Sequence, residues 1–274
     1  VSETCQVFYG DYFPSHLFLN SSSLIFRKIQ ITKNFMLVLV TGSSRGIGKS
    51  IAEKHLAAGD DVIGTSRSDE SPFEENKYSH INCNLANTEE LQKMKAIFDG
   101  KNVPEVVINN AGMFEEADFD IEDNDWVSTW DKTLQVNLKA PSLICKWALN
   151  AWKEQGIEGK IINISSRAGY RGDTQEYAAY AASKGGMVAF TKSIARSFGK
   201  LGVTAYTIAP GFVDTDMARE SIEVYGAEYL TKDLALDSIA PPEQIAEIVY
   251  LIAEGKLTHM TGQTFHINSG SYLI

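Results

Sequence analysis

The chain has 274 residues, of which 44% are hydrophobic and 22% are charged, and its formal net charge is −10 at pH 7. This length and composition allow one large buried core, while the negative charge disfavours a nucleic-acid-binding surface. No stretch approaches the ~20 consecutive apolar residues that a membrane span needs. The three cysteines (Cys5, Cys83 and Cys145) are odd in number and lack metal-ligand spacing, so we expect no metal and a reducing, cytoplasmic location.

Residues 1–35 precede the first clear element of secondary structure and show no regular hydrophobic period. They lack the basic start and the continuous apolar run of a secretory signal. We therefore expect an N-terminal extension of unknown role. Either Met36 is the natural start of the protein, or this arm packs on a neighbouring subunit.

The domain expected over residues 36–274 begins with a strand, a glycine-rich turn and a helix. The apolar run 36–40 leads into the turn 41–48, and apolar residues then recur at helical spacing. Glycines spaced as Gly-x3-Gly-x-Gly let the backbone turn tightly and approach a pyrophosphate, which the helix N-terminus attracts. A nucleotide-binding turn is predicted, shaped by Gly42, Gly46 and Gly48.

The second strand is expected at residues 61–67 and carries the signal for cofactor choice. It ends in Ser66 and Arg67 without an acid. A carboxylate there would bind a ribose 2′-hydroxyl and repel a 2′-phosphate, whereas arginine binds phosphate strongly. Arg67, with Arg45 from the turn, favours NADP(H) over NAD(H), although Asp69 lies close in sequence. Two solvated surface arginines are the alternative interpretation.

Three further apolar strands are expected at 104–108, 160–166 and 203–211. They alternate with helical stretches, which predicts an α/β protein with one doubly wound parallel sheet in a single domain. Small residues, amides and hydroxyls follow these strands, as a cofactor lying across the carboxyl edge of the sheet would need. The helical stretches are expected at 88–98, 126–152, 178–198 and 243–252.

Tyr180 and Lys184 lie four residues apart, so a helix would place both side chains on one face. An ammonium beside a phenol favours the phenolate and lowers the phenol pKa from ~10 toward neutrality. The pair suits carbonyl reduction or alcohol oxidation. Tyr177 is a weaker candidate because the residue four positions later is Ala181.

Several motifs occur together in one order: the glycine-rich turn, Asn-Asn-Ala-Gly at 109–112, Asn137, Ser166, the Tyr180–Lys184 pair and Pro-Gly at 210–211. In this set the chain resembles the short-chain dehydrogenase/reductase family, in its single-domain form, over roughly residues 36–270. Within the family it is similar to the 3-oxoacyl-[acyl carrier protein] reductases, a likeness shared by reductases of other substrates. The resemblance implies a Rossmann-type fold and a homotetramer.

The resemblance also implies a role for each site residue. Ser166, with Ser165 as the alternative, would donate a hydrogen bond to the substrate carbonyl, and Tyr180 would protonate the developing alkoxide. Lys184 would hold the nicotinamide ribose and lower the Tyr180 pKa, while Asn137 would position a water that relays a proton. The positions implied for the cofactor are Gly42, Ser44, Arg45, Gly46, Ile47, Gly48, Ser66, Arg67, Asn84, Leu85, Asn110, Ala111, Gly112, Tyr180, Lys184, Pro210, Gly211, Val213 and Thr215.

The chain departs from the family pattern at three places, one of which is the segment from Ser166 to Tyr180, one residue longer than in the carrier-protein reductases. Asn84 and Leu85 stand where the family usually has Asp and an apolar residue against the adenine, and Asn-Ser-Gly stands at 268–270 where Asp-Gly-Gly is usual. We expect the amide of Asn84 still to hydrogen-bond, and the change at 268–270 to alter a turn.

The substrate is expected to be a small carbonyl or alcohol compound, with a 3-oxoacyl thioester as one candidate. Residues 217–237 are expected to form a mobile lid over it. A sugar, polyol, steroid or small ketone is the alternative, and a non-catalytic NADP(H)-binding sensor or scaffold is a third interpretation. A basic patch near the entrance, or scattered solvated charges, is expected from Arg167, Arg171, Arg196 and Lys200.

Overall fold

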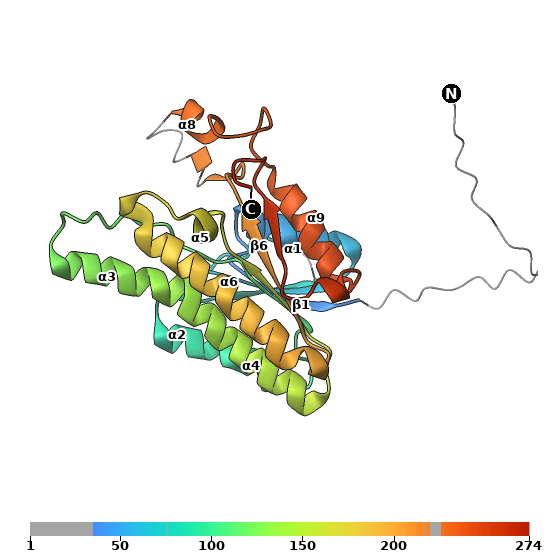
Figure 1. Cartoon of the computed structure of the whole chain (residues 1–274). Helices are drawn as coiled ribbons and strands as arrows, with labels where there is room; N and C mark the ends of the chain where they lie inside the picture. The colour runs from blue at the N-terminus through green and yellow to red at the C-terminus, as the bar shows by residue number, and fades with distance from the viewer. Residues whose placement is uncertain (1–34, 75, 217, 220–225, 274) are drawn as a thin grey trace, which may run out of the picture. The chain divides into compact units, whose positions relative to one another are not determined.

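The structure is a computed structural model, and it describes residues 35–74, 76–216, 218–219 and 226–273. The expectations for residues 1–34 lie outside these described residues. Phe35–Ile274 form one compact unit, which contains every element labelled in Figure 1.

Seven parallel strands form one sheet in the order β3-β2-β1-β4-β5-β6-β7. The central strands are nearly continuous runs of buried Val, Ile and Leu, because helices cover both of their faces. The chain order reverses between β1 and β4, and the carboxyl ends of strands at such a point form a crevice that binds ligands in α/β sheets. The predicted doubly wound Rossmann-type sheet is confirmed. The strands are β1 (Leu37–Thr41), β2 (Asp61–Ser66), β3 (Tyr78–Asn82), β4 (Val106–Asn109), β5 (Lys160–Ile164), β6 (Thr204–Pro210) and β7 (Thr264–Ile267).

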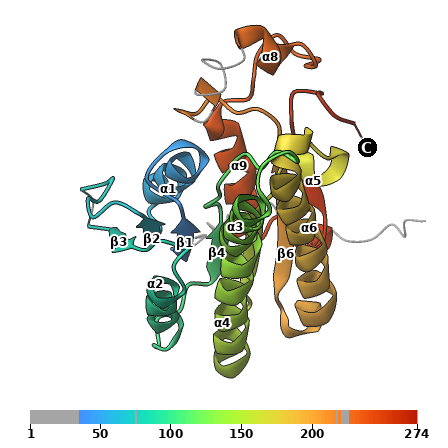
Figure 2. The ribbon, with the colours of Figure 1, turned by 90° about the vertical axis from the view of Figure 1, so that its left-hand side faces the viewer.

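Helices form a layer on each face of the sheet (Figure 2). Helices α1 and α9 share one buried cluster with the sheet, and α2, α4 and α6 share the other. The helices are α1 (Gly46–Ala58), α2 (Thr88–Lys93), α3 (Asp123–Leu134), α4 (Ala140–Gln155), α5 (Ala168–Arg171), α6 (Ala178–Phe198), α8 (Ala227–Thr231) and α9 (Pro242–Ala253). Shorter helical turns are η1 (Met94–Phe98), η2 (Gln135–Lys139), η3 (Gln175–Tyr177), η4 (Gly199–Leu201) and η5 (Thr258–Met260).

Trp152 anchors α4 in the core. Its side chain is 1% exposed, and its indole Nε1 donates to the carbonyl of Pro104 at 2.8 Å. A Cβ on Gly159 would fall 2.2 Å from the indole ring, so the strand β5 can approach α4 only with glycine there. Replacing such a buried tryptophan by alanine typically costs about 3–5 kcal/mol.

The helical stretch predicted over 126–152 is observed, and it contains an unexpected π-helical turn, η2, between α3 and α4. Pro141 follows this turn in the first turn of α4. Proline has no N–H and its ring clashes with the carbonyl four residues back, which is the carbonyl of Asn137 in a regular α-helix. A wider turn relieves that clash.

The strands β3 and β7 were not expected from the sequence. Both lie at the edges of the sheet, and β3 carries polar residues at His80 and Asn82. An edge strand pairs on one side only and is partly solvated, so it lacks the apolar run that marks the central strands.

Candidate active site

Asn110 and Thr41 hold the glycine-rich turn between β1 and α1. Asn110 Nδ2 donates to the carbonyl oxygens of Thr41 and Gly42, both at 3.0 Å. Thr41 Oγ1 accepts from the N–H groups of Asn110 and Ala111 at 3.0 and 3.1 Å. A Cβ on Gly48 would fall 2.1 Å from the Gly42 oxygen, so this turn closes only around glycine. Asn110 therefore supports the shape of the turn.

The two serines of the turn differ in their surroundings. Ser43 is fully buried, and its Oγ shares a 2.7 Å hydrogen bond with the Tyr78 hydroxyl. Ser44, the predicted cofactor contact, is only partly buried. A Cβ on Gly46 would lie 3.1 Å from Thr215 Cγ2, so a residue far along the chain borders the turn.

A polar pocket of about 520 Å³ lies beyond the carboxyl end of β2. Arg67 and Asp69 both line it, and Asp69 accepts a hydrogen bond from Asn82 Nδ2. The Ser66 hydroxyl, also a predicted contact, accepts from the Ser68 N–H at 3.1 Å and so takes part in a local turn. The pocket is lined by Arg67, Asp69, Asn82, Asn84, Glu90 and Lys93.

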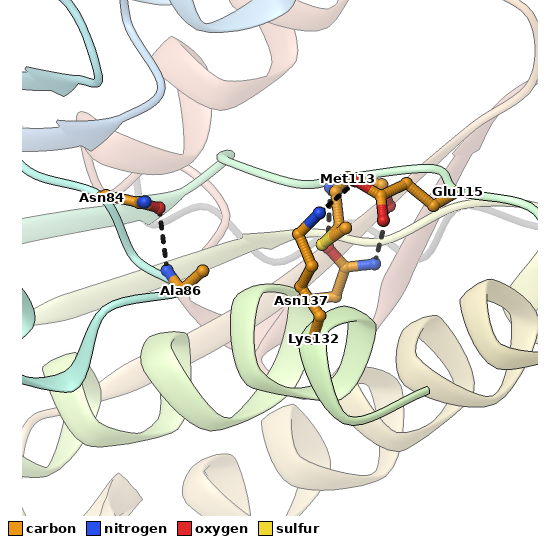
Figure 3. A network of polar contacts seen from close by, with 6 residues as sticks. All are labelled: Asn84, Ala86, Met113, Glu115, Lys132 and Asn137. Atoms are coloured by element: carbon orange, nitrogen blue, oxygen red, sulfur yellow. Dashed lines mark hydrogen bonds and ion pairs between the residues drawn. The ribbon is translucent and has the colours of Figure 1, made fainter. Parts of the chain in front are cut away.

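Asn84 lines this pocket, and its side chain and that of Arg45, on the glycine-rich turn, both have partners. Asn84 Oδ1 accepts from the Ala86 N–H at 3.1 Å (Figure 3), a bond that the carboxylate usual in the family would also make. Arg45 is exposed, with Nη1 4.0 Å from Asp216 Oδ2. Leu85 is 5% exposed. The departure at Asn84 thus preserves the local turn.

Asn137 lies in the π-helical turn and connects the segment after β4 to α6. Its Oδ1 accepts from the Met113 N–H at 2.9 Å, and its Nδ2 donates to the Met113 carbonyl and to Ser183 Oγ, both at 3.0 Å (Figure 3). A Cβ on Gly112 would lie 3.4 Å from Asn137 Oδ1 and 3.3 Å from Lys184 Nζ. Asn137, Gly112 and Lys184 are thus brought together, at a kind of turn that often occurs at functional sites.

The two serines after β5 have different partners. Ser165 is 4% exposed, and its Oγ donates to the Lys184 carbonyl at 2.9 Å, which ties it to the backbone of α6. Ser166 Oγ accepts from the Ala168 N–H at 3.1 Å and forms a hydrogen bond with the Tyr180 side chain. Ser166, not Ser165, therefore shares a site with Tyr180.

Burial dominates the ionisation of Tyr180 and Lys184. It raises the pKa of Tyr180 to about 12, against the lowering effect of the Ser166 hydrogen bond and with a further rise from Asp173. It lowers the pKa of Lys184 to about 8. Lys184 Nζ donates to the Ile164 carbonyl at 2.9 Å and lies 5.7 Å from the centre of the Tyr180 ring. The expected lowering of the Tyr180 pKa by Lys184 is not met, because burial disfavours both charged forms and Nζ is directed to a carbonyl.

Phe114 forms an aromatic wall beside Tyr180 that the sequence analysis missed. Its ring stacks on Tyr177 at 3.8 Å and meets Tyr180 edge-on at 4.8 Å. The Tyr177 hydroxyl donates to Glu116 Oε1 at 2.6 Å, so this tyrosine supports the wall. The sequence did hold a sign of this wall, because Phe114 lies two positions after Gly112, at the edge of the sheet where the cofactor was expected.

The segment after β6 crosses the same edge of the sheet. The Gly211 N–H donates to the Ile267 carbonyl at 2.9 Å, and a Cβ on Gly211 would fall 2.9 Å from Asn268 Cα. Pro210 ends β6, and Val213 is 5% exposed and pairs in a β-bridge with Ala240. Glycine at 211 is therefore required by close packing.

The lid expected over 217–237 lies partly outside the described residues, which omit 217 and 220–225. Its described part contains α8. The Ala235 N–H donates to the Ser269 carbonyl at 2.8 Å, which links this segment to the turn after β7. Ser269 has a φ of 52°, the left-handed region where the family usually has glycine.

Residues 36–225 match the family model described as short chain dehydrogenase. The chain belongs to the short-chain dehydrogenase family. It is therefore an oxidoreductase of that family, as its motifs indicated, and the resemblance to 3-oxoacyl-[acyl-carrier-protein] reductases is also confirmed. The reductase FabG of Vibrio cholerae is 34% identical over 247 residues, covering 87% of this chain and 98% of the relative. FabG of Escherichia coli is 32% identical over 248 residues, which cover 87% of this chain and 98% of that relative.

Solved structures of short-chain dehydrogenases have the same fold. A 4-hydroxyisoleucine dehydrogenase complexed with NADH has a TM-score of 0.78 and 25% identity, covering 86% of this chain and 98% of its own. The aldohexose dehydrogenase of Thermoplasma acidophilum, in ligand-free form, has a TM-score of 0.76 and 26% identity, covering 87% and 94%. Within the described residues, no helix has the length and apolar character needed to cross a membrane.

Proposed function

We propose that this chain is an NADP(H)-dependent carbonyl reductase or alcohol dehydrogenase that works through Ser166, Tyr180 and Lys184, with Asn137 in support. One observation carries the proposal: the Ser166 side chain is hydrogen-bonded to Tyr180, with Lys184 one helical turn away on the same helix. A hydroxyl and a phenol so paired can polarise and protonate one carbonyl oxygen.

The residues around this site fit a nicotinamide cofactor. The turn of Gly42, Gly46 and Gly48 leaves backbone N–H groups at the start of α1 for a pyrophosphate, and Gly112 leaves space beside Lys184 Nζ. When bound, such a cofactor supplies or accepts a hydride at the reacting carbon. Lys184 would hold its ribose.

The protonation states suit reduction at neutral pH. Because the pKa of Tyr180 is raised to about 12, its hydroxyl keeps the proton that it would donate to the developing alkoxide. Because the pKa of Lys184 is about 8, its ammonium is mostly charged and would stabilise the phenolate left behind. Ser166 would hold the substrate oxygen, and Asn137 would position a proton-relaying water.

Support for NADP(H) over NAD(H) comes from the pocket beyond β2. Arg67 lines it and can form charge-assisted hydrogen bonds to a 2′-phosphate, and Arg45 of the glycine-rich turn is a second exposed arginine that could reach that group. Asp69 lines the same pocket, but its carboxylate accepts from Asn82. The pocket therefore offers a cation to a 2′-phosphate, with one carboxylate already engaged.

The substrate is a carbonyl or alcohol compound, and likeness to the FabG reductases supports a 3-oxoacyl thioester as the first candidate. A sugar, polyol, steroid or small ketone is the alternative, and likeness to the aldohexose dehydrogenase supports a sugar among these. A homotetramer and a cytoplasmic location stay predictions from the family resemblance, and light scattering tests the first.

The test is NADPH oxidation with acetoacetyl-CoA, a surrogate for a carrier-bound thioester. We expect Tyr180→Phe to lower kcat by about 10²–10⁴-fold, the usual contribution of general acid catalysis. The matched control is Tyr177→Phe, which removes a neighbouring hydroxyl and should keep most of the activity. Full activity of Tyr180→Phe would refute the acid role. NADPH binding without turnover would instead direct the search to a panel of ketones and sugars.

A further inference from the structure

Arg167 is a buried arginine directly after Ser166 in the chain. Arg167 is only 6% exposed, so it does not belong to the basic surface patch expected from the sequence. Its backbone N–H donates to the Pro210 carbonyl at 2.9 Å, which fixes it between the ends of β5 and β6. Arg167 therefore lies at the carboxyl edge of the sheet, within one side-chain length of the residue expected to hold the substrate oxygen.

One nitrogen of the Arg167 guanidinium is left without a partner in the part of the chain that the structure describes. The guanidinium carbon lies 4.5 Å from the centre of the Phe212 ring. Nη1 is buried and has no hydrogen-bond partner among the residues that the structure describes. Arg171, one helical turn away, differs because its Nη2 lies 3.9 Å from Asp173 Oδ1.

An unpaired buried cation is unfavourable, so proteins normally pair such charges. Burial lowers the pKa of Arg167, and the like charge of Arg171 lowers it further. Asp173 and Asp233 oppose this change through longer-range attraction, without an ion pair to Arg167 in the described part of the chain. A bound anion would supply the missing partner.

The surroundings favour a singly charged anion. Phe212 covers one face of the guanidinium, and Asp173 and Asp233 already add negative charge nearby. These carboxylates would repel a dianionic phosphate more strongly than a monoanionic carboxylate. A carboxylate also matches the planar fork of arginine.

We propose that Arg167 binds a carboxylate group of the substrate, so that the enzyme acts on short oxo acids or their hydroxy-acid counterparts in preference to uncharged ketones. The inference rests on the proposed function, because it assumes that the reacting carbonyl lies at Ser166 and Tyr180. It places free oxo acids ahead of the 3-oxoacyl thioester that was the first candidate above, because the negative charges of an acyl-CoA thioester lie many bonds from the reacting carbonyl.

The test compares pyruvate, acetoacetate and 4-oxopentanoate with their methyl esters, which differ in charge and little in shape. With NADPH, we expect the wild type to prefer at least one acid to its ester by about tenfold or more in kcat/KM, the range of one charge-assisted hydrogen bond. Arg167→Met should lose that preference while its activity on the ester changes little. Arg171→Met is the matched control and should keep the preference.

A binding measurement separates this inference from the proposed function. Calorimetric titration of pyruvate, acetoacetate and 4-oxopentanoate into protein loaded with NADP⁺ measures binding alone, because an oxo acid and NADP⁺ have no hydride to exchange. Tyr180→Phe should still bind the preferred acid, whereas Arg167→Met should not. Thermal melting checks that each variant is folded, and Arg167→Lys, which keeps the charge, should retain partial binding. Failure of the wild type to bind any of these acids, or equal binding by Arg167→Met, would overturn the inference, whereas binding without turnover would count against the proposed function alone.

Discussion

Asn110 Nδ2 lies 3.0 Å from the Gly42 carbonyl oxygen, a contact that joins the end of β4 to the turn after β1. The same nitrogen also reaches the Thr41 carbonyl at 3.0 Å. A Cβ on Gly48 would fall 2.4 Å from it. One amide therefore fixes the turn predicted to bind the cofactor, although the two segments are far apart in the sequence.

Asn110→Ala should weaken cofactor binding and lower stability together. It leaves two carbonyls without their donor, and each unsatisfied buried group costs about 1–3 kcal/mol. The check is calorimetric binding of NADP⁺ beside urea unfolding. Asn102→Ala, an exposed asparagine, is the control and should change neither. Unaltered binding in a destabilised Asn110→Ala would show that the turn keeps its shape without this amide.

Lys184 should make stability depend on pH in the alkaline range. Its pKa is about 8 in the folded protein against an ordinary 10.5, so between these values the folded state binds fewer protons than the unfolded chain. The penalty for burying its charge is complete below pH 8 and fades as pH rises toward 10.5.

Lys184→Met removes this titration. From pH 7 to 9.5 the wild type should gain about 2 kcal/mol relative to the variant, at about 1.4 kcal/mol per pKa unit. Urea unfolding at both pH values measures the change. A difference that stays constant with pH would contradict the lowered pKa.

Arg67→Ala should discriminate between the two cofactors. Losing a charge-assisted hydrogen bond to a 2′-phosphate raises the KM for NADPH about 10- to 100-fold, while that for NADH changes little. Steady-state kinetics with both cofactors measures the effect. Arg196→Ala, an exposed arginine on α6, serves as the control. An equal rise in the KM for NADH would mean that Arg67 does not bind the 2′-phosphate.

Ser269→Gly should stabilise the protein. Ser269 has a φ of 52°, and this left-handed conformation costs an L residue roughly 1–2 kcal/mol. Glycine relieves that cost but loses more entropy on folding, so the net gain is about 0.5–1 kcal/mol. Denaturant unfolding measures it. Ser271→Gly, two residues later, lacks the strain to relieve and should give no gain.

The central elements were predictable because their signals are local. The apolar runs of β1, β4 and β5 and the glycine-rich turn each encode their own conformation. The edge strand β3 has no such run, and its pairing with β2 arises from tertiary contact. The turn η2 depends on Pro141 and on the bonds between Asn137 and the distant Met113. The helical period of the sequence does not register either feature, so it predicts an uninterrupted α-helix across this turn.

The candidate site shows the same division. The alternation of strand residues predicted that only one of Ser165 and Ser166 faces the site, and the Lys184 carbonyl determines which one. The Tyr180 pKa and the burial of Arg167 depend on elements packed around them. Residue identity therefore indicates the chemistry, while the surrounding packing sets the charge state.

The π-helical turn also has a consequence for insertions and deletions. Each residue of an α-helix advances the chain by about 100° around the axis. The π-helical turn Gln135–Lys139 holds about one residue more than an α-helical turn, so removing one residue there would let a regular α-helix run from α3 into α4 and would remove the wide turn that brings Asn137 to Met113. Many side chains along α3 and α4 can vary without that effect. The number of residues between α3 and α4 is therefore more constrained than the identity of those side chains. A homologue with a different number of residues there needs another arrangement around Asn137.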